Sequence, residues 1–179
     1  MVIGEGSASW TMVHDLAARL PAMILPRWLR NVSYPVFIDD VVAGLLGALT
    51  LECTGSLCLD IPGAERITHR DMLNRTAAAM GHDRVMVNVP ILSPRLSSYW
   101  IALVTRVDLS LAKELVEGVR HNLEPGDSLA WDVIGHQPME LDRAVELALA
   151  DDGADKIPTA ATEARLRELG TKFAERAAS

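Results

Sequence analysis

The sequence predicts an α/β fold, in which short strands alternate with amphipathic helices along the chain. Three observations support this prediction. A short apolar run from Val36 to Ile38 leads into an apolar helix. A second strand-like run lies between Arg84 and Pro90, after another helical segment. A turn at Gly4 separates a third apolar fragment from a helix, which is the order expected of an α/β chain.

Composition restricts the class of protein. The chain has 179 residues, enough for one domain with an ordinary core, and 49% of them are hydrophobic. A net charge of -7 argues against a nucleic-acid partner. The sequence contains no apolar run of about 18 residues and no signal-peptide order, so we expect no membrane partner. Cys53 and Cys58 lack the surrounding ligands of a metal site, which favours ordinary thiols and a cytoplasmic location.

The N-terminal segment combines a strand fragment, Met1 to Ile3, with a turn that contains Gly4, Ser7 and Ser9. A glycine turn after a strand can hold a phosphate group with its bare backbone N–H groups. Here Ser9 replaces the third glycine of the dinucleotide pattern, the strand is short, and no acid ends a second strand at the expected distance. We therefore expect the turn to border a substrate pocket.

The next segment places Trp28 between two cations, Arg27 and Arg30. The arginines can hold an anionic ligand by paired hydrogen bonds, with the indole as a stacking plane. The alternative is a loop whose tryptophan packs on the core and whose arginines are solvated.

The helix that follows Val36 to Ile38 begins with two carboxylates. Asp39 or Asp40 is expected to cap it by accepting a hydrogen bond from an unpaired backbone N–H group. Its glycines, Gly44 and Gly47, are tolerable only where another element approaches closely. We therefore expect this helix to pack on a sheet as a core element and not as a site.

The middle of the chain adds a strand and a capped helix. Gly55 to Asp60 alternates like a strand. Thr68 to Asp71 has the form of a capping box, with Asp in place of Glu, and Gly81 is expected to end the helix. His69 falls in the first helical turn, where we expect an exposed histidine.

The segment from Leu92 to Val104 is the most aromatic in the chain. Arg95 and Tyr99 can line a cavity that Trp100 covers. The alternative is a core helix whose tyrosine hydroxyl reaches a single partner.

The remainder is predicted to be helical. One helix is capped by Ser110, and another runs from Pro138 to Ala150. We divide the chain into residues 1–150 and an amphipathic C-terminal helical tail, residues 151–179, which docks on the domain, docks on a partner, or frays.

The sequence contains few patterns that are typical of catalytic or metal-binding residues. The five histidines lack the spacing of zinc ligands, and no Gly-x-Ser-x-Gly elbow occurs. Asp39 and Asp40 are adjacent in the chain and do not form a facing acid/base pair. The sequence predicts no catalytic residue and no metal site.

The order of these motifs resembles the C-terminal half of extended and atypical short-chain dehydrogenases/reductases. This family includes nucleoside-diphosphate-sugar epimerase-like proteins and their NmrA-like relatives. The resemblance covers about residues 1–150. The segments on which the resemblance rests are Arg30 to Tyr34, Val36 to Ala43, Leu57 to Gly63, Ile67 to Leu73, Gly81, and Pro90 to Thr105.

The resemblance implies the C-terminal portion of a Rossmann-like fold with a small helical substrate-side subdomain. It also implies a parent activity of NAD(P)-linked oxidoreduction or epimerisation. The family's glycine-rich cofactor loop is absent from this sequence, and so is its Tyr-x-x-x-Lys, since Tyr34 precedes Ile38 and Tyr99 precedes Leu103 at that spacing. We therefore expect a chain that begins inside the sixth strand of such a sheet, binds no cofactor alone and is not a competent dehydrogenase.

Half of a sheet leaves an open edge and exposed apolar faces. The expected partners are therefore a small-molecule ligand and either a second copy, as a homo-oligomer, or a missing N-terminal half. The alternative function is a stand-alone, non-enzymatic small-molecule-binding module or oligomer subunit. The residues expected in the substrate-pocket wall are Gly4, Ser7, Ser9, Arg27, Trp28, Arg30, Arg95, Tyr99 and Trp100.

Overall fold

The computed structural model describes residues 1–19, 22–25, 27–52, 54–82, 85–88, 105, 107–126 and 130–151. Within these residues the protein is a mixed α/β structure, as the sequence predicts. The aromatic segment 92–104 and the tail beyond residue 151 lie outside the described residues, so the predictions for Arg95, Tyr99, Trp100 and a tail helix concern parts that are not described.

Two strand–helix units form the centre of the fold. Strand β1 (Val2–Ile3) leads through the Gly4 turn into helix α1 (Ala8–Arg19). Strand β4 (Val36–Phe37) leads directly into helix α2 (Ile38–Ala48) and pairs with β1 in parallel. Parallel strands that each feed a helix are typical of α/β folds.

The other described strands form two more pairs, so three two-stranded sheets stand in place of one continuous sheet. Strand β2 (Ala22–Leu25) pairs in parallel with β6 (Val85–Asn88), which confirms the strand predicted before Pro90. Strand β3 (Val32–Ser33) pairs antiparallel with β5 (Ile67–Thr68).

The strand predicted from Gly55 to Asp60 is wrong. Residues 55–59 are irregular, and only Asp60 makes a single bridge. The Asp60 carboxylate accepts a hydrogen bond from Gly126 N at 2.6 Å, and its backbone oxygen accepts one from Ala130 N at 2.8 Å. These contacts tie the segment to the connection before helix α6 (Ala130–Ile134). The alternation of apolar and polar residues between Gly55 and Asp60 thus belongs to an irregular segment held by these contacts and not to a strand.

Helix α3 (His69–Ala79) begins at the predicted N-cap, Thr68, although Asp71 bonds the hydroxyl of Thr68 and not its backbone N–H as in a capping box. Thr68 Oγ1 accepts a hydrogen bond from Asp71 N at 3.0 Å and donates one to Asp71 Oδ2 at 2.7 Å. Gly81 follows with φ +74, the left-handed conformation that ends many helices. Both predicted ends of this helix are confirmed.

Two later helices begin at other residues than predicted. Helix α5 (Leu109–Gly118) is capped by Asp108 and not by Ser110, because the Asp108 carboxylate accepts hydrogen bonds from the backbone N–H groups of Ser110 and Leu111. Helix α7 (Leu141–Asp151) starts three residues after Pro138.

Helix α2 differs most from its prediction. It begins at Ile38, one residue before the carboxylates, and its N-cap, Phe37, makes no side-chain capping bond. The predicted cap at Asp39 or Asp40 is therefore wrong. The predicted packing on a sheet is also wrong, because Gly44 and Gly47 face Trp131 and Ile134 of α6.

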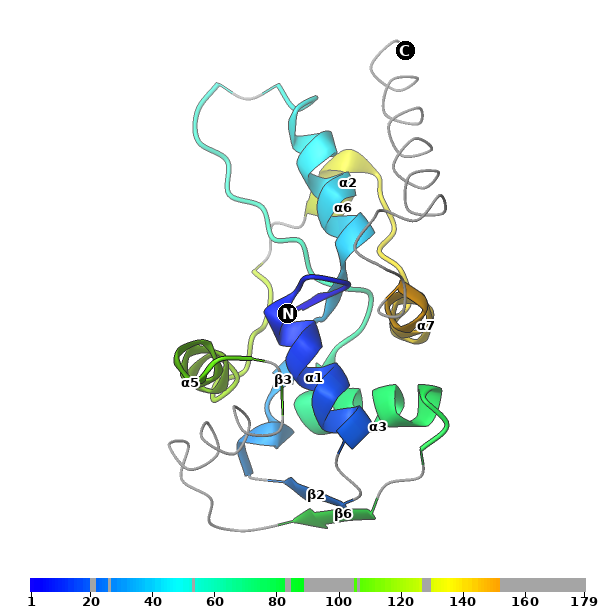
Figure 1. The fold of residues 1–179 in the computed structure, drawn as a ribbon. Coiled ribbons are helices and arrows are strands. Elements are labelled where there is room, and N and C mark those ends of the chain that lie inside the picture. The colour runs from blue at the N-terminus through cyan, green and yellow to red at the C-terminus, as the bar shows by residue number, and fades with distance from the viewer. Residues whose placement is uncertain are drawn as a thin grey trace.

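Three helices enclose the main core (Figure 1). Helix α1 lies in the centre, with α3 below it, α7 on one side and α5 on the other; α2 and α6 lie together at the upper end, and β2 and β6 at the lower end. The buried core residues of α1, α3 and α7 are Trp10, Val13, Ala17, Met72, Leu73, Ala77, Leu141, Ala144, Val145 and Ala148. Met12 faces a second cluster, formed with Ala112 and Val116 of α5.

No described helix is long and apolar enough to cross a lipid bilayer.

Candidate functional site

The turn between β1 and α1 folds its serines back onto the strand. Ser7 Oγ donates a hydrogen bond to Val2 O at 2.8 Å, and Ser9 Oγ donates one to the same oxygen at 3.2 Å. The backbone N–H groups of Trp10 and Thr11 donate to the side-chain and backbone oxygens of Ser7. Ser7 and Ser9 therefore stabilise the start of α1, and Ser7 Oγ engages Trp10 N, one of the N–H groups of the first helical turn.

Gly4 is explained by close packing. Its φ of +148 is unfavourable for other residues, and a Cβ atom at this position would lie 2.7 Å from Ile38 Cγ2. The glycine lets the first residue of α2 approach the turn. Gly6, in the same turn, has φ +79 and open space around its Cβ position, so the close packing at Gly4 does not extend to Gly6.

The other predicted pocket residues are placed only in part. Arg27, Trp28 and Arg30 belong to a short 3₁₀ helix, η1 (Arg27–Arg30), which contacts α3. The side chain of Arg30 is exposed, whereas the side chains of Arg27 and Trp28 are outside the description. Gly4 and Ser7 thus lie in one turn and Ser9 in the first turn of α1 beside it, and no described contact joins Arg30 to them.

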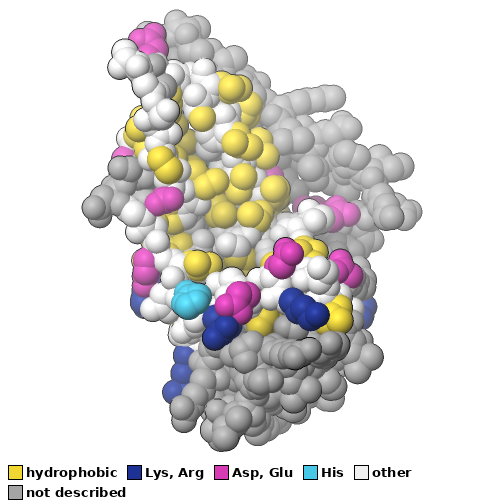
Figure 2. All heavy atoms as spheres, turned by 90° about the vertical axis from the view of Figure 1, so that its left-hand side faces the viewer, with side chains coloured by type: hydrophobic (Ala, Val, Ile, Leu, Met, Phe, Trp, Pro, Cys, Tyr) yellow, Lys and Arg dark blue, Asp and Glu magenta, His cyan; other side chains and the backbone are white. Residues whose placement is uncertain are grey.

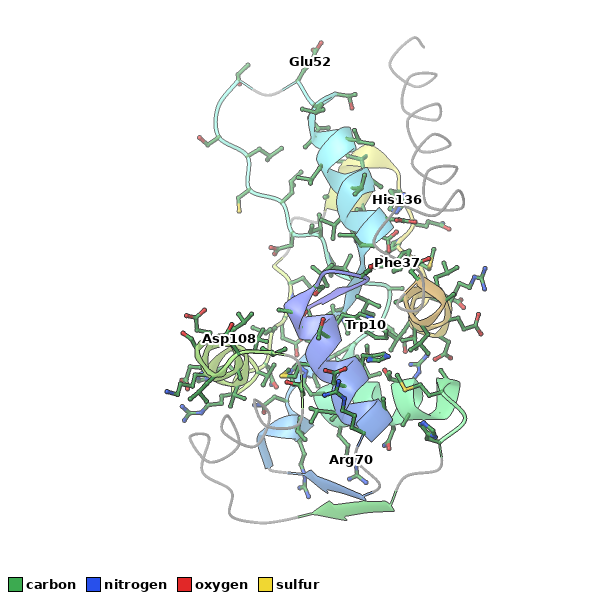
Figure 3. All side chains as sticks on the ribbon, in the orientation of Figure 1. Trp10, Phe37, Glu52, Arg70, Asp108 and His136 are labelled. Carbon is green, nitrogen blue, oxygen red and sulfur yellow. The ribbon has the colours of Figure 1, made fainter. Side chains whose placement is uncertain are left out.

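A histidine–carboxylate pair that sequence reasoning missed lies beside the first turn of α2 (Figure 3). His136 Nε2 is 2.7 Å from Asp40 Oδ1, and Met139 N donates to Asp40 Oδ2 at 3.0 Å. Asp40 is buried, with 3% of its surface exposed. The Trp131 ring lies 5.2 Å from the imidazole, between ring centroids.

This pair resembles part of a general-base arrangement, since a buried carboxylate that orients an imidazole is one component of such sites. Within the described chain, however, no hydroxyl or thiol is hydrogen-bonded to His136. The pair joins α2 to residues 136–139, which lead into α7. The contact therefore links two segments that are distant in the sequence.

A second carboxylate, Asp15 of α1, is also buried. His14 Nδ1 lies 3.2 Å from its Oδ1, and Arg19 lies 3.6 Å from its Oδ2. Arg19 is one helical turn further on, so it can balance the charge of Asp15. Across the parts of the chain that are described, no group of three or more potential metal ligands occurs.

Three buried polar atoms have no hydrogen-bond partner among the described atoms: Trp10 Nε1, Ser33 Oγ and His69 Nε2. His69 is 6% exposed, so the prediction of an exposed histidine is wrong. Its backbone N–H donates to Asn31 O, which draws the first turn of α3 against β3. Burial, with a smaller contribution from the nearby amino group of Met1, lowers the pKa of His69 to about 4.

The surface around α2 is strongly apolar. Figure 2 shows hydrophobic side chains gathered on the upper part of one face, with most of the charged side chains in a band below them. The exposed large hydrophobic residues of α2 and the loop after it are Ile38, Leu45, Leu49 and Leu57. Contiguous apolar surface of this kind marks interaction sites in folded proteins.

No known protein-family model matches the chain, and no curated protein sequence gives a significant match. The resemblance to short-chain dehydrogenases/reductases therefore stays a prediction based on the order of the sequence motifs.

Proposed function

We propose that this chain is the substrate-binding C-terminal portion of an NAD(P)-dependent oxidoreductase or epimerase-like protein. We further propose that it is not catalytically competent alone. The observation that carries the proposal is the parallel pairing of β1 with β4, each of which leads into a helix. This arrangement is expected where two strand–helix units belong to one parallel sheet.

The absence of independent activity is supported by the chain's own residues. The sequence has no tyrosine four residues before any of its lysines, so it lacks the family's proton donor pair. Ser7 and Ser9 are engaged by Val2 and do not present hydroxyls to a cofactor phosphate.

The decisive experiment is a titration of the full chain with NADPH and NADH, followed by the fluorescence of its four tryptophans. We expect no saturable quenching, whereas a dehydrogenase of known cofactor affinity gives saturation in the same assay. Saturable, tight binding overturns the proposal. In that case Ser7→Ala shows whether the turn after β1 is the phosphate site.

The substrate-side role is tested at Arg30, the described member of the predicted cationic segment. A nucleoside diphosphate sugar is the probe, because the resemblance implies that class of ligand. We expect Arg30→Ala to weaken its binding, measured calorimetrically, by about tenfold or more, the usual scale of a lost charge-assisted hydrogen bond. Arg143→Ala is the matched control, since Arg143 is also exposed and lies on α7. Equal affinity of the two variants argues against a site at Arg30.

The second candidate function is a non-enzymatic binding module or oligomer subunit. The exposed aliphatic side chains of Leu45, on α2, and of Leu49, the residue that follows the helix, favour it, because monomeric proteins rarely leave such a surface uncovered.

A further inference from the structure

We draw no further inference here: the strongest candidate, the side-chain cluster of Asp40, His136 and Trp131 beside the first turn of α2, belongs to the site already described, and nothing among the described residues around it indicates a ligand.

Discussion

Two buried titratable side chains, Asp40 and His69, show how differently single residues are accommodated in this protein. Asp40 accepts hydrogen bonds from His136 and from Met139 N, so its burial is compensated. The Nε2 atom of His69 has no hydrogen-bond partner among the described atoms, and the lowered pKa of this histidine keeps it neutral. Removing Asp40 should therefore cost stability, whereas an apolar side chain at position 69 should be tolerated.

The variant Asp40→Ala should be less stable by about 1–3 kcal/mol, because it leaves Met139 N and His136 without their acceptor. Urea unfolding of the full chain measures this difference. Asp132→Ala is the control, since Asp132 is exposed on α6 and its loss should change the free energy of unfolding by about 0.5 kcal/mol or less. If the two variants are equally stable, the Asp40–His136 contact does not hold the segments together.

His69 predicts a specific loss of stability in acid. Its pKa is about 4 in the folded protein against 6.5 as a free side chain, so the unfolded chain binds a proton first as the pH falls. The free energy of unfolding is unaffected by His69 above pH 6.5. It falls between pH 6.5 and about 4 as the unfolded chain takes up the proton, by a total on the order of 3 kcal/mol.

Denaturant unfolding as a function of pH tests this prediction. The variant His69→Leu should show a shallower decline of the free energy of unfolding across that pH interval. His121→Gln, at an exposed histidine, should decline as the wild type does. A His69→Leu curve parallel to the wild type contradicts the assignment.

At the scale of elements, α2 depends on close contact with α6. A Cβ atom at Gly47 would lie 2.7 Å from Ile134 Cγ2 and 3.0 Å from Ile134 Cβ, so Gly47→Ala forces the two helices apart. Overpacking of this kind costs about 1–3 kcal/mol and outweighs the gain in helix propensity. Gly118→Ala on α5 has open space around it and should be neutral or stabilising by up to about 1 kcal/mol. In thermal unfolding, the midpoint of Gly47→Ala should therefore fall, and that of Gly118→Ala should stay unchanged or rise.

At the scale of the whole molecule, the sequence predicts the features that are decided within a few residues. The Thr68 cap and the stop at Gly81 involve only neighbours in the chain, and both are confirmed. The partner of Asp40 is 96 residues away, and no local pattern specifies it. His69 is likewise buried by its bond to Asn31 and the adjoining core, although helical first-turn residues are often exposed.

The same limit applies to the candidate site. The glycine turn is predictable as a turn, because Gly4 and the serines are close in sequence. The close packing at Gly4 is not predictable, since it depends on the approach of Ile38 from a distant strand–helix unit. The apolar character of α2 is visible in the sequence, but the face that is buried is decided by the contact of Gly44 and Gly47 with α6.

The junction around Gly63 is where three distant segments of the molecule meet, and it yields the strongest test of the fold. Gly63 N donates to Tyr34 O at 3.2 Å, and Trp131 Nε1 donates to Pro62 O at 2.6 Å. A Cβ atom at Gly63 would lie only 1.7 Å from Pro35 O, which is backbone and cannot rotate away. Gly63→Ala should therefore separate the loop from β4 and cost several kcal/mol, with loss of the cooperative thermal transition followed by circular dichroism. Gly55→Ala, in open space on the exposed loop, should melt as the wild type does. A cooperative, unshifted transition in Gly63→Ala means that the loop does not pack on Pro35, and with it the arrangement of α2, α6 and β4 described above is wrong.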